Sequence, residues 1–131
     1  MNPEINLKIY GVVTIGPKWQ VIIPKEARVD FDIKESQDLD IAIIDRMWFW
    51  IWSTENIEKE CAMDNKTVEH EGSIKIWSKL QFVIPANVRN KLWIEPKENL
   101  LVIGKWKVWM GFIKNDDIEY MLNYIKENSQ Q

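Results

Sequence analysis

The sequence predicts a mainly β fold with short helices, built from two tandem ββαββ repeats. Two observations lead to this fold class. Shifting the chain against itself so that Gly11 meets Gly72 aligns residues 11–28 with residues 72–89 without a gap, and we call this shift the repeat offset. Each of these segments contains two short, β-branched apolar runs, and the second run ends in Ile-Pro before a polar stretch. Such runs, separated by turn residues, are typical of β-strands.

The repeat continues beyond these segments. Among the 48 pairs that begin at positions 11 and 72, 12 are identical. The identical residues of the first repeat are Gly11, Ile15, Lys18, Gln20, Ile23, Pro24, Arg28, Ile33, Leu39, Trp48, Ile57 and Glu58. A proline, an arginine and a glutamine in register within apolar runs favour duplication over chance. We therefore expect a first repeat at 1–63, a linker at 64–71, and a second repeat with a C-terminal helix at 72–131.

In the first repeat, strands are expected at 8–15 and 20–24, joined by a turn at 16–19. Pro24 ends the second strand and suits the first turn of a helix from Lys25 to Phe31, because its missing N–H is not needed there. The remaining elements of this repeat are predicted as strands at 38–45 and 48–53 and a helix from Thr54 to about Ala62.

In the second repeat, strands are predicted near 72–76, 81–85, 99–104 and 108–113. Asn115 or Asp116 is expected to cap a final helix that reaches about Lys126. The apolar face of this helix would consist of Ile118, Met121, Leu122 and Ile125. The spacing of these four residues is that of an amphipathic helix.

Composition excludes several classes of protein. The 131 residues are 46% hydrophobic and 28% charged, which is a globular composition. No run reaches the roughly 18 apolar residues that span a bilayer, and the N-terminus lacks the pattern of a signal peptide. We therefore expect a cytoplasmic protein with no membrane partner. A lone Cys61 and a lone His70 fit neither a disulfide nor a structural zinc site.

The sequence contains no catalytic triad, phosphate loop or metal-ligand spacing, so neither enzymatic activity nor a cofactor is predicted. The net charge is −3. A nucleic-acid surface on such a chain would have to be a local patch. The acidic residues cluster elsewhere, at 58–71 and 116–127.

The order "strand, turn with Lys and Gln, strand ending in Ile-Pro, helix with Arg" resembles the AbrB/SpoVT/MazE/MraZ superfamily. It stands in residues 11–28 as GVVTIGPKWQVIIPKEAR, and residues 81–96 repeat it as QFVIPANVRNKLWIEP. The resemblance covers roughly residues 8–53 and 70–113. It implies a swapped-hairpin, double-psi-like β-barrel formed by two interlocked repeats. The layout is most like MraZ, although the turns lack the Asp that MraZ-like turns carry.

The resemblance also implies that the first hairpin and first helix of each repeat contact DNA. The residues offered there are Lys18, Gln20, Lys25, Arg28, Lys75, Lys79, Gln81 and Arg89. Arg and Lys would contact phosphates or guanine, and a Gln can pair bidentately with adenine. Without the resemblance these residues would be ordinary exposed turn and helix residues. Their recurrence in both repeats favours a functional role.

The tryptophans form an unusual pattern. The chain has 8 Trp and only 5 Gly. Trp19 lies in a tight turn, and Trp93 follows a helix where glycine is the usual residue. Our hypothesis is that UGA codons are read as glycine at many or all of these positions. The alternative is that the indoles are real and form an aromatic core or a stacking platform for single strands.

Two functions follow from these expectations. The first is a DNA-binding transcriptional regulator, associated with the nucleoid, that binds double-stranded DNA and reads similar half-sites with its two repeats. The second is an antitoxin-like protein that neutralises a toxin partner through its C-terminal helix. A homo-oligomer is compatible with either function, because exposed edge strands favour assembly.

Overall fold

A computed structural model describes residues 7–53, 68–105, 108–119, 123 and 126. The described chain is mainly antiparallel β-structure with two short helices, so the prediction of a mainly β fold is confirmed. In chain order the elements are β1 (Leu7–Thr14), β2 (Gln20–Ile22), α1 (Lys25–Asp30), β3 (Asp38–Ile44), β4 (Trp48–Trp52), β5 (Val68–Lys75), η2 (Ser78–Leu80), β6 (Gln81–Val83), α3 (Ala86–Leu92), β7 (Asn99–Lys105), β8 (Trp109–Lys114) and η3 (Asn115–Asp117).

Prolines set the start of both helices. Pro24 and Pro85 are the N-cap residues of α1 and α3, with φ of −56° and −61°. Their fixed φ suits the entry to a helix, and their lack of an N–H ends the preceding strand. The helix predicted at 54–62 lies outside the described residues. Of the predicted C-terminal helix, the described part begins with the 3-10 turn Asn115–Asp117.

Strand β5 begins at Val68, whereas the sequence predicted a strand that begins only at residue 72. The added residues lie in the segment that we expected to be a linker. They pair with the end of β3, where Val68 faces Ile44 and His70 faces Ala42. Because β5 is an edge strand, polar side chains in it are tolerated, and the apolar alternation that marks a strand is weak there.

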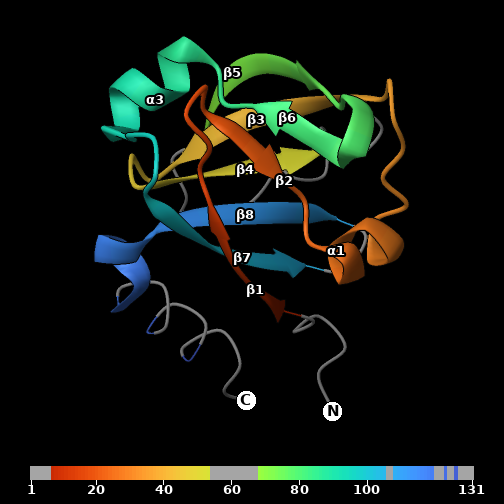
Figure 1. Ribbon diagram of the computed structural model, residues 1–131. Helices are drawn as coiled ribbons and strands as arrows, with labels where there is room; N and C mark the ends of the chain where they lie inside the picture. The colour runs from red at the N-terminus through yellow and green to blue at the C-terminus, as the bar shows by residue number, and fades with distance from the viewer. Residues whose placement is uncertain (1–6, 54–67, 106–107, 120–122, 124–125, 127–131) are drawn as a thin grey trace.

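A six-stranded antiparallel sheet has the order β1-β7-β8-β4-β3-β5, and β2 pairs with β6 in a separate two-stranded ribbon. Figure 1 shows β2 and β6 side by side over the sheet, with α1 and α3 at opposite ends of the pair. We call the pair β2–β6 the ribbon. It carries both turns and leads into both helices.

The two edge ladders are related by the same repeat offset that relates the two halves of the sequence. Strand β1 pairs with β7, with Thr14 facing Asn99. Strand β5 pairs with β3, with Lys75 facing Asp38. The repeat offset carries Thr14 onto Lys75 and Asp38 onto Asn99. The first strand of each repeat thus pairs with a strand of the other repeat, so the two halves interlock.

Glycine occurs where each edge strand bulges. Gly11 and Gly72 have φ of 120° and 111°, values that L side chains rarely adopt. The register shifts beside both residues, between Ile9 and Gly11 on β1 and between Ile41 and Ala42 opposite β5. Bulges of this kind bend a strand, and here they occur at equivalent places in the two repeats.

The central strands are buried on both faces. In β3, Leu39, Ile41 and Ile43 belong to the larger of two buried apolar groups, which we call the inner core. This group also contains Val21 and Phe82 of the ribbon. We call the second apolar group the outer cluster. Its members are Ala42, Ile44, Trp48, Trp50, Trp52, Leu101, Ile103, Trp109 and Ile113. Within the described part of the chain, no helix is long and apolar enough to cross a membrane.

Candidate nucleic-acid interface

The ribbon has an inner and an outer face. Val21 faces Phe82 at its centre, and both side chains are fully buried in the inner core. Because side chains alternate along a strand, the neighbours of these residues lie on the outer face. The first repeat places Gln20 and Ile22 there, and the second places Gln81 and Val83. The repeat offset maps Val21 onto Phe82, so a pseudo-twofold axis passes through the centre of the ribbon.

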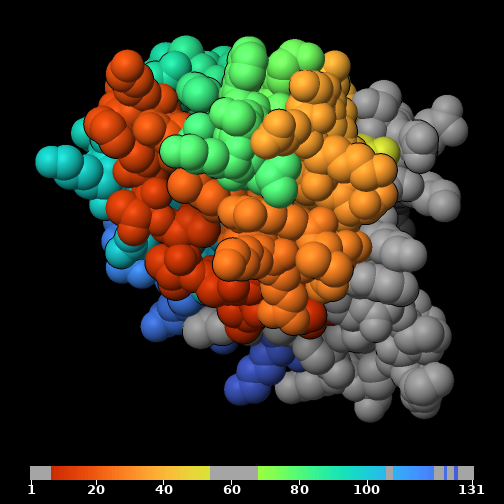
Figure 2. All heavy atoms as spheres, turned by 45° about the vertical axis from the view of Figure 1, so that its right-hand side comes forward, coloured from red at the N-terminus to blue at the C-terminus, as the bar shows by residue number. Residues whose placement is uncertain are grey.

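Backbone hydrogen bonds join each turn to the opposite repeat. The Ile84 N–H donates to the Trp19 carbonyl at 3.0 Å, and the Ile23 N–H donates to the Leu80 carbonyl at 3.1 Å. The turn of the first repeat thus lies beside the start of α3, and the turn of the second lies beside the start of α1. Figure 2 shows the orange residues of β2 and α1 and the green residues of the second turn and β6 gathered on one face.

This arrangement regroups the predicted site residues. The resemblance nominated these residues repeat by repeat and did not say which turn would lie beside which helix. The structure brings Lys18 together with α3, which carries Arg89. At the other end, the turn with Lys79 lies beside α1, which carries Lys25 and Arg28. Each end of the ribbon is a composite of both repeats.

The two equivalent arginines are held differently. The Arg28 Nε donates to the Ile23 carbonyl at 2.7 Å, which fixes the side chain against the end of β2. The Arg89 guanidinium lies over the Trp19 ring, 4.1 Å from its centroid. The Arg89 Nε is buried and has no hydrogen-bond partner among the described residues. The two equivalent guanidinium groups are therefore held by different kinds of contact, a hydrogen bond for Arg28 and an aromatic ring for Arg89.

The predicted lysines fall into two groups. Lys18, Lys25 and Lys79 are exposed at the ends of the ribbon. Lys75 lies at the end of β5, where its Nζ pairs with Asp38 at 3.3 Å. An anion bound at Lys75 would have to compete with this carboxylate. The charge of Lys75 is therefore partly offset by Asp38.

Each turn also contains a hydrogen bond from a lysine backbone N–H to a side chain. The Gln20 Oε1 accepts a hydrogen bond from the Lys18 backbone N–H at 2.8 Å, which orders the first turn. In the second turn, the Lys79 backbone N–H donates to the Glu35 Oε2 at 3.3 Å. Glu35 thus contacts the backbone of Lys79, one of the predicted cations, and the sequence did not indicate this contact.

Two apolar residues of the outer face were missed by sequence reasoning. Ile22 is 49% exposed and Val83 is 41% exposed, although both lie in apolar runs. The strict alternation of a strand was the available signal, since residues on either side of a buried Val21 or Phe82 must point outward. The outer face thus combines two amides with two aliphatic side chains.

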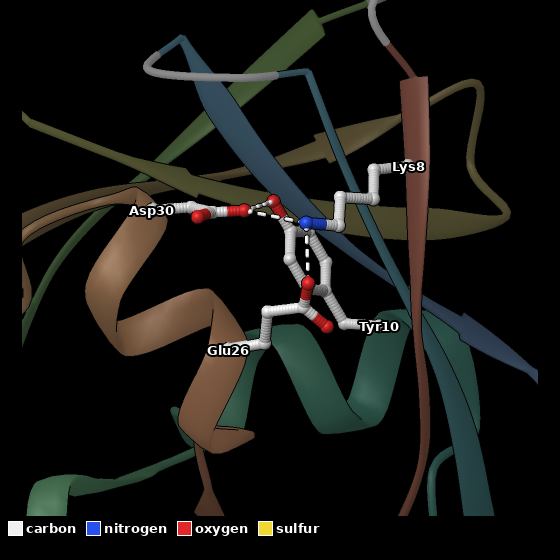
Figure 3. A network of polar contacts seen from close by, with 4 residues as sticks. All are labelled: Lys8, Tyr10, Glu26 and Asp30. Atoms are coloured by element: carbon white, nitrogen blue, oxygen red, sulfur yellow. Dashed lines mark hydrogen bonds and ion pairs between the residues drawn. The ribbon is translucent and has the colours of Figure 1, made fainter.

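A polar network fixes α1 to β1 (Figure 3). The Tyr10 hydroxyl donates to the Asp30 Oδ2 at 2.8 Å, and the Lys8 Nζ contacts the same oxygen at 3.1 Å and also pairs with Glu26. The hydrogen bond from Tyr10, followed by that from Lys8, lowers the pKa of Asp30. Burial, followed by the bond to Asp30, raises the pKa of Tyr10. This network anchors α1, the helix that carries Lys25 and Arg28. Lys8 offsets the negative charges of Glu26 and Asp30 on the same helix.

The equivalent network of the second repeat has the opposite polarity. The Lys91 Nζ on α3 contacts the Glu71 Oε2 on β5 at 2.9 Å, and the Asn87 Nδ2 donates to the Glu71 Oε1 at 2.6 Å. The bond to Glu71 raises the pKa of Lys91. In the first repeat the strand carries the cation and the helix the anion; in the second repeat the charges are reversed. Both helices are fixed to a strand of their own repeat.

His70 lies exposed on β5, with its Nε2 3.1 Å from the Asp40 Oδ1. Among the described residues, no group of three or more His, Cys, Asp or Glu side chains is placed to hold a metal ion. Cys61 lies outside the described residues, as do Met121, Leu122 and Ile125 of the predicted C-terminal stripe. The described residue of that stripe, Ile118, packs against the outer cluster.

No protein-family model matches the chain, and no curated protein matches it. Among solved structures, the solution structure of PHS018 from Pyrococcus horikoshii is similar, with 13% sequence identity and a TM-score of 0.44. The match covers 81% of this chain and 90% of that one.

Proposed function

We propose that this chain is a DNA-binding transcriptional regulator of the AbrB/SpoVT type, acting in the cytoplasm on the nucleoid. The observation that carries the proposal is the ribbon. Gln20 and Gln81 lie on its outer face in pseudo-twofold positions, and a composite cationic site lies at each end. A pseudo-twofold protein surface suits a duplex with two similar half-sites.

We further propose that the two halves form a swapped-hairpin barrel of two repeats, at 1–63 and 72–131, joined through 64–71. The support is the exchange of β1 and β5 between halves, with the same repeat offset relating both edge ladders. In this arrangement one chain supplies the protein surfaces that bind both half-sites of the DNA. DNA binding then does not depend on a second copy of the chain.

Each group on the outer face has a chemical counterpart on DNA. A two-stranded antiparallel ribbon fits the major groove, where Gln20 and Gln81 would pair with adenine edges. The aliphatic Ile22 and Val83 suit thymine methyl groups, which lie in the same groove. The cations at the ends, which are Lys18, Lys25, Arg28, Lys79 and Arg89, would contact phosphates and set the register.

The number of these cations predicts the salt dependence. If all five contact phosphates, log Kobs should fall with log salt with a slope of about −4 to −5. Because the net charge is −3, binding away from the ribbon is unfavourable. We therefore expect a steep salt dependence that a few substitutions reduce.

The test is fluorescence-anisotropy titration with DNA from upstream of the protein's own gene and with scrambled DNA, over a salt series. The double variant Lys18→Ala/Lys79→Ala should reduce the slope by about 2 and weaken binding to both DNAs equally. The double variant Gln20→Ala/Gln81→Ala should instead reduce the preference for the upstream DNA, by roughly 10-fold or more.

Lys75→Ala is the matched control, because it removes a cation that is already paired with Asp38. It should leave both the slope and the selectivity close to wild type. Equal binding to scrambled and upstream DNA would contradict a sequence-specific regulator. Absence of salt-dependent binding would contradict DNA binding altogether, and a toxin partner would then be sought by pull-down.

A further inference from the structure

The backbone at two tryptophans has the conformation that glycine favours. Trp19 has φ of 59°, and Trp93, the C-cap of α3, has φ of 58° and ψ of 43°. A residue with a Cβ is strained in this left-handed region, whereas glycine is not. Glycine is also the usual residue just past the end of a helix. The Trp93 side chain is 80% exposed, so little packing offsets the strain.

Three further tryptophans have equivalents that point the same way. At the repeat offset, Trp77 corresponds to Gly16, and Trp50 corresponds to Gly111. A Cβ at Gly16 would lie 2.4 Å from the end of the Gln20 side chain, which would then have to move. Trp106 lies outside the described residues, but its equivalent, Asp45, has φ of 52°.

Trp19 also breaks the symmetry of the candidate interface. In the first repeat the Arg28 Nε donates to the Ile23 carbonyl, and the equivalent acceptor for Arg89 is the Ile84 carbonyl. Arg89 instead lies over the Trp19 ring, and its Nε finds no partner among the described residues. Glycine at position 19 would remove the ring and leave Arg89 free to adopt the position of its counterpart.

In the part of the chain that the structure describes, three buried tryptophans lack the hydrogen bond that an indole N–H normally makes. The indole N–H groups of Trp50, Trp52 and Trp109 are buried without a hydrogen-bond partner among the described residues. A buried indole N–H usually finds a partner, and leaving a buried donor unpaired is destabilising. The Trp50 and Trp109 rings stack on each other, with centroids 4.3 Å apart.

From these observations we propose that all eight tryptophan positions are encoded by UGA and that the source cell inserts glycine there. A cell that reads UGA as tryptophan makes the form described here. The proposal accounts at once for the left-handed backbone, the glycine equivalents and the unpaired indoles. It is independent of what the protein binds.

The decisive measurement is peptide mass spectrometry of the protein purified from its own cells, together with the codons of the gene. UGA codons and glycine at all eight positions are the expected result. Tryptophan in the native peptide at either position 19 or position 93, or a UGG codon there, would overturn the proposal. Tryptophan confined to another position would overturn it for that position.

A second measurement tests the structural argument in recombinant protein. Trp93→Gly should raise Tm by about 5 °C, because it relieves a left-handed residue that makes few contacts. The matched control is Asn90→Gly, an exposed position inside α3, which should lower Tm by a few degrees. A decrease in Tm for Trp93→Gly like that of the control would contradict the argument from backbone strain.

Discussion

Phe82 connects the ribbon to the sheet, and its removal should be severe. Its ring is fully buried and packs edge-on against Phe112 and Phe49, with centroids 5.5 and 6.3 Å away. Phe49 and Phe112 stack at 4.9 Å. Phe82→Ala would remove the ribbon's aromatic contacts with Phe49 and Phe112.

The cost can be worked from these contacts. Truncation of a buried phenylalanine costs about 3–5 kcal/mol, and this range already includes the lost aromatic pairing. With a total stability of roughly 5–15 kcal/mol, such a loss is a large fraction of the whole. In urea, an m-value of about 2 kcal/mol/M converts about 4 kcal/mol into a decrease of about 2 M in the midpoint.

The assay is urea denaturation followed by circular dichroism, with Val83→Ala as the control. Val83 is the next residue along β6 but points outward, so its truncation should change stability by no more than about 0.5 kcal/mol. Equal midpoints for the two variants would refute the conclusion that the ribbon closes the inner core. None of the buried tryptophans belongs to this core, so the result does not depend on their identity.

The remaining predictions concern the polar contacts. Tyr10→Phe should destabilise by about 1–2 kcal/mol in chemical denaturation, because it removes a hydrogen bond to a carboxylate. The raised pKa of Tyr10 means that its contribution is complete below about pH 10 and is lost as the pH rises further, so Tyr10→Phe should flatten the alkaline limb of the stability profile. The lowered pKa of Asp30 means that its contribution is present above about pH 4 and is lost as the pH falls, so Asp30→Asn should flatten the acid limb. Asp40→Leu should raise stability by about 1 kcal/mol, because Asp40 is buried with one oxygen unpaired among the described residues and the equivalent Leu101 is apolar; a lower melting temperature would contradict this.

Local signals in the sequence predicted the elements well. The Ile-Pro pairs ending at Pro24 and Pro85 marked both strand ends and both helix starts, because a missing N–H acts within its own neighbourhood. The start of β5 at Val68 was missed, since residues 68–71 are mostly polar and lie at a sheet edge. Their assignment to a strand depends on pairing with β3, which no local pattern encodes.

The sequence nominated members of the candidate interface but not how they are grouped in space. Recurrence at the repeat offset identified Lys18, Gln20 and Arg28 with their equivalents. The sequence did not indicate that the first turn meets α3, because this contact depends on how the two halves interlock. Nor did the sequence indicate the contact between Lys8 and Asp30, which are 22 residues apart, or the ion pair between Lys75 and Asp38.

The exchange of first strands has a consequence during protein synthesis. Thr14 leaves the ribosome 85 residues before Asn99, the residue that it faces in the finished sheet. At a synthesis rate of roughly 5–20 residues per second, about 4–17 s pass between the synthesis of Thr14 and that of its partner Asn99. Strand β3 meanwhile offers an edge that only β5 will cover. The nascent first half therefore emerges with open strand edges, which creates an opportunity for misassembly during translation.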